Sequence, residues 1–202
     1  MFSPDRCWWK SLAPRRRRYI ATDLDPEHLA RLRNRLHHRP NLETAHCDLT
    51  SAADFAPYAG QMDTVVCLNV LEHVEDDLGG LRNLLSALKP DGRAVVLVPQ
   101  GQWAYGTLDR ALGHARRYAR RELVQRMEQA GFMVERVIEF NRISLPGWFL
   151  SGRILRRSTF SRFQLAVFDR LVWLWRRIDR FLPWGPTSLI GVGVKPPAGY
   201  MK

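Results

Sequence analysis

The chain has 202 residues, of which 25% are charged and 46% hydrophobic, a profile that fits one globular domain with a sizeable core. No apolar run approaches the length of a membrane span, and none follows the basic N-terminus, so we expect neither a spanning helix nor a signal peptide. The net charge of +11 is uneven, because residues 1–20 carry six Lys or Arg against one Asp and residues 142–182 carry nine Arg against two Asp. The sequence predicts a neutral core with two basic appendages, which suit an anionic membrane surface or a nucleic acid.

The main domain is expected to span residues 19–202 and to begin with a short strand at residues 19–22. Pro26 suits the first turn of a helix, for which Asp25 is the expected N-cap. That helix should bury one face lined by leucines. A second strand is expected at residues 43–47.

The most informative stretch is residues 62–78, which begins as an apolar, β-branched run and then turns polar. The run at residues 62–68 predicts a strand that is covered on both faces. The polar residues that follow it are Asn69, Glu72, His73, Glu75, Asp76 and Asp77. A buried strand that ends in polar side chains indicates the carboxyl edge of a parallel sheet, where open α/β folds bind their ligands.

Residues 78–88 carry leucines on one helical face, and residues 89–92 predict a stop and turn. Residues 93–99 predict another strand that is covered on both faces. Strand and helix patterns thus alternate three times along the chain. This alternation predicts an α/β fold, with a Rossmann-like and mostly parallel sheet and helices on both of its faces.

Residues 101–120 interrupt the alternation, and their glycine, aromatic and polar residues predict an insertion over the ligand edge. A helix at residues 121–130 and a strand at residues 132–140 are expected next. Residues 142–186 predict a basic, aromatic and mostly helical segment, which precedes a last strand at residues 188–195.

Within that segment, residues 160–182 predict one long amphipathic helix with arginines on one face and apolar side chains on the other. Trp173 and Trp175 cannot both face the same core, and tryptophans beside a basic helix are typical of membrane interfaces. We therefore expect weak binding to anionic membranes. The alternative is a helix that packs on the sheet and keeps its arginine face in water.

The three cysteines are far apart in the sequence and have no metal-ligand spacing, so no metal site is expected. Cys47 and Cys67 lie in strand-like runs and are interpreted, unlike Cys7 near the N-terminus, as buried and reduced thiols. Reduced thiols favour a cytoplasmic location, which includes the inner surface of the membrane.

Five stretches form a pattern through their order and spacing, namely ATDLDP at 21–26, HCDLT at 46–50, DTVVCLNVLEHVEDD at 63–77, LLSALKPDGRAVVLVPQ at 84–100 and ELVQRMEQAGFMVERV at 122–137. Together they resemble the class I S-adenosylmethionine-dependent methyltransferases. The stretch GQW…DRALGHARRY is similar to a bacterial, small-molecule subgroup of this class. The resemblance implies S-adenosyl-L-methionine as the cofactor and a small-molecule or lipid-like acceptor.

The resemblance also implies six cofactor-binding residues, namely Asp23, Leu24, Asp48, Leu49, Asn69 and Val70. Asp23 would accept hydrogen bonds from both ribose hydroxyls, with Leu24 against the adenine face. Asp48 would accept from the adenine amino group, with Leu49 presenting a backbone amide. Asn69 and Val70 would line the methionine side of the cofactor. The alternatives are a helix cap for Asp23 and a turn-forming side chain for Asp48.

The N-terminus departs from the family pattern, in which the first strand ends in a Gly-rich cofactor loop. Residues 1–18 contain no glycine and are too few for a strand, a loop and a full helix. We therefore expect the first strand and the Gly-rich loop to be absent, and residues 1–18 to be a remnant of the first helix or disordered. Such a sheet would bind the cofactor less well, and its unpaired backbone edges would favour self-association.

Methyl transfer to a hydroxyl or an amine requires removal of a proton, and the candidate catalytic bases are His73 and His114. Their alternative roles are structural, with His73 bonded to the local acidic residues and His114 holding the insertion. Glu72 is interpreted as a carboxylate near a helix N-terminus.

These observations favour an enzyme that methylates a small-molecule or lipid-like acceptor. The alternative is a non-catalytic protein that keeps the methyltransferase fold with weak or no cofactor binding. A nucleic-acid-binding module is the weakest hypothesis, because the basic stretches interleave with wide apolar faces and match no nucleic-acid motif. No nucleic-acid partner is therefore expected.

Overall fold

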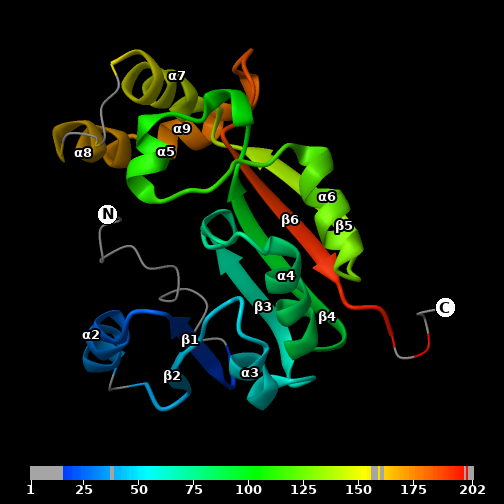
Figure 1. The fold of residues 1–202 in the computed structure, drawn as a ribbon. Helices are drawn as coiled ribbons and strands as arrows, with labels where there is room; N and C mark the ends of the chain where they lie inside the picture. The colour runs from blue at the N-terminus through cyan, green and yellow to red at the C-terminus, as the bar shows by residue number, and fades with distance from the viewer. Residues whose placement is uncertain (1–15, 37–38, 156–158, 160–161, 198, 200–202) are drawn as a thin grey trace.

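The computed structural model describes residues 16–36, 39–155, 159, 162–197 and 199 (Figure 1). Its strands are β1 (Tyr19–Asp23), β2 (Leu42–His46), β3 (Met62–Leu68), β4 (Leu88–Pro99), β5 (Met133–Phe140) and β6 (Ser188–Val194). Its α-helices are α2 (Pro26–Leu36), α3 (Ala52–Phe55), α4 (Asp77–Ala87), α5 (Thr107–Leu112), α6 (Arg120–Gln129), α7 (Leu145–Phe149), α8 (Arg162–Arg170) and α9 (Val172–Ile178). Shorter turns are η3 (Ala56–Tyr58), η4 (Leu71–His73), η5 (Gln102–Ala104), η6 (Arg142–Ser144), η7 (Leu150–Ile154) and η8 (Asp179–Phe181).

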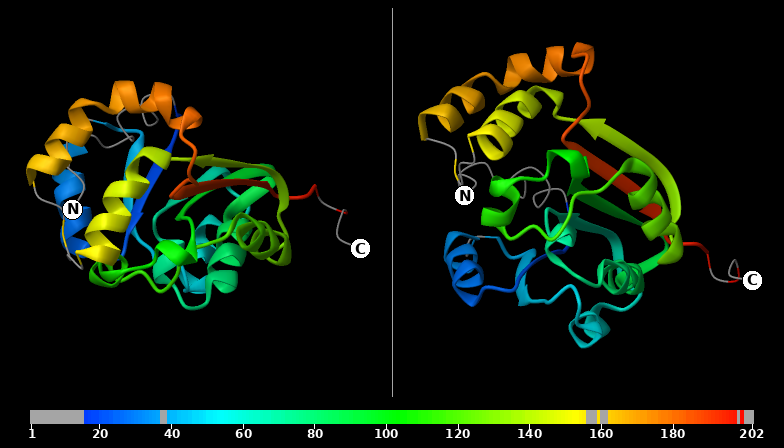
Figure 2. Two further views of the ribbon diagram at one scale, coloured as in Figure 1. Left: turned by 90° about the horizontal axis from the view of Figure 1, so that it is seen from above. Right: turned by 45° about the horizontal axis from the view of Figure 1, so that its top comes forward.

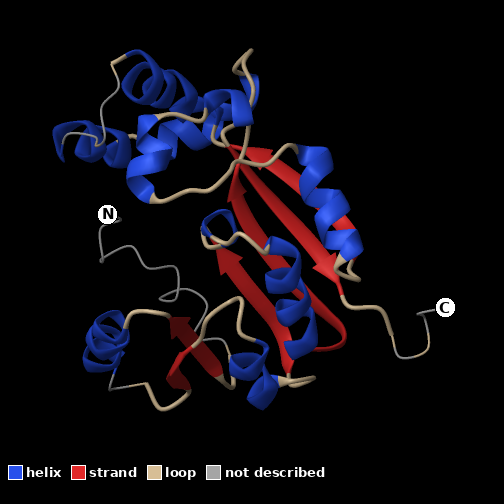
Figure 3. Cartoon of the chain, in the orientation of Figure 1, coloured by secondary structure: helices blue, strands red, loops and turns tan. Residues whose placement is uncertain are grey.

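The strands form two sheets (Figure 3). β1 pairs in parallel with β2, and the larger sheet has the order β3-β4-β6-β5, in which β6 is antiparallel to both of its neighbours. The arrowheads of β1, β3 and β4 point to the same side, so the carboxyl ends of these strands share one side of the molecule (Figure 1). The Rossmann-like α/β architecture predicted from the sequence is confirmed, with one reversed strand.

No ladder joins β1 or β2 to the larger sheet among the described residues. The expected absence of a first strand and a Gly-rich loop concerns residues 1–18, of which the structure describes 16–18. The two sheets are connected by packing and side-chain hydrogen bonds. Leu49 and Phe55, which follow β2, belong to the main buried cluster, and Asn83 of α4 donates to the Leu49 carbonyl at 2.9 Å.

The helices begin where the sequence provides caps. Asp25 accepts a hydrogen bond from the Glu27 amide at 2.8 Å, so it caps α2 as predicted, with Pro26 in the first turn. Asp76 accepts from the Gly79 amide at 2.8 Å and caps α4. Each cap satisfies a backbone donor that the helix itself leaves without a partner.

One face of the larger sheet carries the core. Helices α4 and α6 pack against this face, and alternate residues of β4 point into it, so that Ala94, Val96 and Val98 are fully buried. On the other face, Val66 of β3 is 36% exposed and Ile138 of β5 is 40% exposed. The prediction that residues 62–68 are covered on both faces is therefore wrong for β3, because Val66 is exposed on the face opposite to the core.

Two other expectations about boundaries are corrected. Helix α4 ends at Ala87, just before the stop predicted at residues 89–92, but the next strand begins earlier than the expected residue 93. It starts at Leu88 and resumes its register with β3 at Arg93 after a bulge in which Asp91 has a φ of 61°. The predicted single helix at residues 160–182 is divided into α8 and α9 at Leu171, whose ψ of 6° is not helical. Its first two residues lie outside the described ones.

Two of the three cysteines lie among the described residues, and both are the reduced thiols that the sequence indicated. Cys67 is buried and Cys47 is half-buried, and both are free thiols. Burial raises the pKa of Cys47 to about 11 and that of Cys67 to about 12, so both thiols are protonated at neutral pH. Cys7 lies outside the described residues.

The segment from α7 to η8 lies beyond the carboxyl ends of the strands, beside the 101–120 insertion (Figure 2). The Thr107 hydroxyl donates to the Gly152 carbonyl at 2.9 Å and joins α5 to η7. Among the described helices, none combines the length and the apolar character needed to cross a bilayer.

The buried glycines of β6 allow α6 to approach the sheet, which gives a test of the packing. A Cβ atom on Gly193 would lie 2.7 Å from Met127 Cε and 3.0 Å from Phe132 Cβ. We expect Gly193→Ala to lower the free energy of unfolding by about 1–3 kcal/mol through overpacking. Gly185→Ala is the matched control, because a Cβ atom there meets nothing within 4 Å. Urea denaturation of both variants measures the difference, and equal stabilities would contradict this account of the packing.

Candidate functional site

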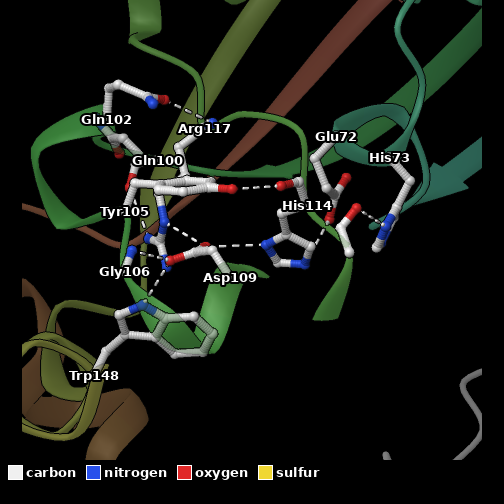
Figure 4. Close-up of polar contacts among 11 residues, drawn as sticks. Glu72, His73, Gln100, Gln102, Tyr105, Gly106, Asp109, His114, Arg117 and Trp148 are labelled. Carbon is white, nitrogen blue, oxygen red and sulfur yellow. Dashed lines mark hydrogen bonds and ion pairs between the residues drawn. The ribbon is translucent and has the colours of Figure 1, made fainter. Parts of the chain in front are cut away.

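Two segments that are distant in the sequence meet beyond the carboxyl end of β3. Glu72 and His73 lie on η4, directly after β3, and His114 lies after α5 in the insertion (Figure 4). The Glu72 side chain is 0% exposed, the His114 side chain is 9% exposed, and His73 lies at the surface. The two imidazole rings meet edge to face with centroids 4.9 Å apart. We call these three residues the Glu72–His73–His114 cluster.

A buried carboxylate orients His114. Asp109 of α5 lies 3.0 Å from His114 Nδ1 and accepts a 2.7 Å hydrogen bond from Arg117 Nε, and the Gly106 amide donates to it at 2.9 Å. Burial alone would raise the pKa of Asp109, but the hydrogen bonds from His114 and Arg117 outweigh it and hold the pKa below its ordinary value. Asp109 is therefore ionised and acts as an acceptor only.

The partners of the two histidines decide which nitrogen carries a proton. The Asp109 carboxylate can only accept, so Nδ1 of His114 is the donor. Nδ1 of His73 lies 3.0 Å from the Gly113 carbonyl, which also only accepts, so this Nδ1 is protonated as well. In the neutral form of each ring, the Nε2 atom therefore carries the lone pair.

Glu72 has an unusual environment for a carboxylate. Both of its oxygens are buried and have no hydrogen-bond partner among the described residues, and the nearest cationic candidate, His114 Nε2, is 3.9 Å away. Burial raises the pKa of Glu72 to about 7, although His114 and Arg117 nearby act in the opposite direction. Glu72 does lie in the first turn of η4, the helix-terminus position that the sequence indicated, but its side chain is buried.

The arrangement of the Glu72–His73–His114 cluster fits a cation. One ligand atom from each of the three residues lies within 4.8 Å of the others. A carboxylate and two imidazoles are ligands that transition-metal ions accept, and the same lone pairs can also take a proton from a bound acceptor.

The raised pKa of Glu72 predicts a specific pH dependence of stability. The unfolded carboxyl ionises near its ordinary value of 4.5 and the folded one near 7, so the unfolded state loses its proton first as the pH rises. The free energy of unfolding should therefore fall between about pH 4.5 and pH 7, by up to roughly 3 kcal/mol. Glu72→Gln cannot ionise and should not show this fall.

We expect Glu72→Gln to be about 1–3 kcal/mol more stable than the parent chain at pH 8 and similar to it at pH 5. Urea denaturation in chelator-treated buffer at both pH values measures this. Glu135→Gln is the control, because Glu135 lies in an exposed ion pair with Arg93. A Glu72→Gln variant that is less stable than the parent at pH 8 would contradict the prediction.

Asp23 and Asp48, the two acids predicted to bind the cofactor, lie at the same edge of the β1–β2 sheet. Asp23 ends β1 and pairs in parallel register with His46, the last residue of β2, and the Cys47 amide donates to the Asp23 carbonyl at 3.3 Å. Asp48 follows two residues after His46. Both acids therefore lie at the carboxyl end of the β1–β2 sheet, the arrangement that a single nucleoside bridging them requires.

Each of these acids also makes a local turn contact. Asp23 Oδ1 accepts from the Asp25 amide at 2.9 Å, while its Oδ2 lies 3.6 Å from His28. Asp48 Oδ1 accepts from the Thr50 amide and hydroxyl, both at 2.8 Å, and these bonds lower the pKa of Asp48. The turn role weighed for Asp48 is thus present, whereas Asp23 makes a turn contact in place of the helix cap that was weighed for it, because Asp25 caps α2. Each contact occupies one carboxylate oxygen.

The other predicted cofactor residues differ in accessibility. Leu24 and Val70 are exposed at 54% and 40%. Asn69 is also at the surface, in the left-handed conformation with a φ of 51°, and its amide donates to the Leu97 carbonyl. Leu49 is buried, and its carbonyl accepts a hydrogen bond from Asn83 of α4. A left-handed asparagine at the end of a strand is a conformation often found at functional sites.

The sequence did not identify Asp109 or Asp77, which hold the insertion in place. Tyr118 is fully buried, and its hydroxyl donates to Asp77 at 3.0 Å, while Arg116 lies 3.3 Å from the same carboxylate. The available signal was the density of charged residues in an otherwise aromatic insertion. Neighbouring residues in the sequence do not reveal which of these charges become buried pairs.

Comparison with known families agrees with this geometry. Residues 8–94 match the family model described as a methyltransferase domain. This match covers less than half of the chain. The described chain as a whole shares the fold of solved methyltransferases, one of them in complex with SAH, and S-adenosyl-L-methionine remains the cofactor that the resemblance implied. No curated protein sequence matches the chain.

Solved structures share the fold of this chain at low sequence identity. A candidate methyltransferase from Bacillus halodurans C-125 is 15% identical with a TM-score of 0.61, and the match covers 92% of this chain and 86% of that one. The [4+2]-cyclase SpnF is 15% identical with a TM-score of 0.62, over 94% and 70% of the two chains. The trans-methyltransferase CalH in complex with SAH is 17% identical with a TM-score of 0.57, over 88% and 42%.

Proposed function

We propose that this chain transfers the methyl group of S-adenosyl-L-methionine to a small-molecule or lipid-like acceptor. The observation that carries the proposal is the position of Asp23 and Asp48 at one rim, on the same side of the molecule as the Glu72–His73–His114 cluster. A nucleoside contacting both acids would direct its sulfonium toward the strand that bears Asn69.

The chemistry needs alignment and a destination for the acceptor's proton. Methyl transfer from a sulfonium is an in-line displacement, so the acceptor must lie opposite the sulfur and be shielded from water. The Nε2 lone pairs of His73 and His114 are available to accept the proton of a hydroxyl or an amine. Asp109 would hold His114 in the required orientation.

The alternative is a non-catalytic protein that keeps the fold but binds the cofactor weakly or not at all. It is favoured by the two separate sheets and by the turn contacts that occupy one oxygen of each acid. A solved [4+2]-cyclase with the same fold shows that this fold does not fix the reaction.

Calorimetric titration with S-adenosylhomocysteine distinguishes the methyltransferase from the non-catalytic protein. We expect one binding event per chain, and we expect Asp23→Asn to weaken it about tenfold to a hundredfold, since charge-assisted hydrogen bonds contribute about 1.5–3 kcal/mol. Asparagine keeps an oxygen for the Asp25 amide, so the turn survives. Asp63→Asn is the control, because Asp63 lies at the opposite end of β3 in an exposed pair with Lys89. No heat for the parent chain would favour the non-catalytic alternative.

We also propose a peripheral contact with anionic membrane, which would bring a lipid-like acceptor to the domain. The supporting surface lies on α9 and η8, where Trp173 and Phe181 are 60% and 71% exposed beside arginines. Arg177 lies 5.4 Å above the Trp173 ring, and Arg180 lies 4.6 Å above the Phe181 ring. Exposed aromatic rings beside basic side chains suit a membrane interface, which includes the inner membrane surface.

Flotation with anionic liposomes at low salt tests this contact. We expect the parent chain to co-migrate, and we expect the double variant Trp173→Ala, Phe181→Ala to lose at least most of this binding, because it removes the two rings that would enter the interface. Met133→Ala is the control, since Met133 is exposed at the amino end of β5. Equal flotation of both variants, or none of the parent chain, would reject the contact.

A further inference from the structure

The Glu72–His73–His114 cluster contains lone pairs without a matching donor. Both Glu72 oxygens are completely buried and unpaired in the described part of the chain, and Oε1 lies 3.9 Å from His114 Nε2 (Figure 4). A buried polar atom without a partner costs about 1–3 kcal/mol, and an ionised one costs more. A folded chain retains such a cost where another charge completes the site.

The second nitrogen of each histidine is already held. His114 Nδ1 bonds to the Asp109 carboxylate and His73 Nδ1 bonds to the Gly113 carbonyl, both at 3.0 Å. Metal-ligating histidines are held in this way, with one nitrogen donating to a carboxylate or a backbone carbonyl and the other facing the ion. Arg117 in turn fixes Asp109 at 2.7 Å. The support that a metal site needs is therefore present around the cluster.

We propose that Glu72, His73 and His114 form a binding site for a divalent transition-metal ion of the Zn²⁺ type. Two imidazoles and one carboxylate are a ligand set of Zn²⁺ and Fe²⁺ sites, whereas Mg²⁺ and Ca²⁺ prefer oxygen ligands throughout. Bonds of about 2.0–2.2 Å would require the ligand atoms to approach more closely than their present spread of up to 4.8 Å. Binding of the ion would therefore draw the three side chains closer together.

Three protein ligands leave at least one coordination position open. If the chain is the methyltransferase proposed above, on which this step rests, the open position would bind the hydroxyl oxygen of the acceptor. The ion lowers the pKa of that hydroxyl, its proton passes to solvent, and the oxygen attacks the methyl carbon as the carbon–sulfur bond breaks. In this case the histidines position the ion and do not accept the proton themselves.

Metal binding can be measured without the cofactor. Chelator-treated protein is titrated with Zn²⁺ by calorimetry, and Co²⁺ absorption spectra report the coordination. We expect one ion per chain, no heat with Mg²⁺, and at least a tenfold loss of Zn²⁺ affinity in each of Glu72→Gln and His73→Ala. His73 is a surface residue, so its variant should fold, which circular dichroism checks.

His46→Ala is the matched control, because His46 is an exposed histidine that lies 3.4 Å from Asp54, outside the cluster. It should bind Zn²⁺ as the parent chain does. Absence of Zn²⁺ binding, or the same affinity in the parent chain, Glu72→Gln and His73→Ala, would overturn the inference. The titration with S-adenosylhomocysteine does not depend on the metal. A protein that binds Zn²⁺ but not S-adenosylhomocysteine would therefore refute the methyltransferase role and leave the metal site standing.

Discussion

The buried ion pair between Arg117 and Asp109 is the contact on which the candidate site depends. Both side chains are nearly inaccessible, at 1% and 0% exposure, and the bond between them is 2.7 Å long. Removal of one partner from such a pair costs about 3–5 kcal/mol, because a charge is left buried and alone. The Arg117 guanidinium also donates to the Gln100 carbonyl at the end of β4 and lies 4.7 Å from the Trp148 ring of α7. One arginine thereby joins the sheet, the insertion and the C-terminal segment.

Much of the fold followed from periodicity and from local chemistry. The alternating strands and helices, the Asp25 cap and the insertion after β4 could each be read from a few neighbouring residues. The division of the sheet into two and the open face bearing Val66 could not, because apolar alternation reveals which side chains are suited to burial and does not reveal whether a helix is present to cover them. Similarly, one amphipathic pattern did not reveal the break at Leu171.

The candidate site was predicted unevenly for a related reason. His73 and His114 could be selected because histidine is rare and chemically versatile, and Asp23 and Asp48 because each follows a strand. The pKa of Glu72 is affected by His114 and Arg117, which are more than forty residues away, and the role of Asp109 depends on its contacts with the same two side chains. Long-range pairs of this kind determine the charge of a group, and they are invisible in a local stretch of sequence.

The separation of the two sheets has a further consequence for the way the reactants would meet. Asp23 and Asp48 belong to the smaller sheet and the Glu72–His73–His114 cluster to the larger one. In the described part of the chain, side-chain packing such as that of Leu49 against α4, together with the Asn83 hydrogen bond, joins them in place of a shared ladder. Displacement reactions lose rate steeply when the attacking atom is misplaced by as little as 1 Å. The distance between methyl donor and acceptor would then depend on the packing of the Leu49 side chain and on the Asn83 side-chain amide, so that loss of a methylene group in this contact would change turnover through that distance.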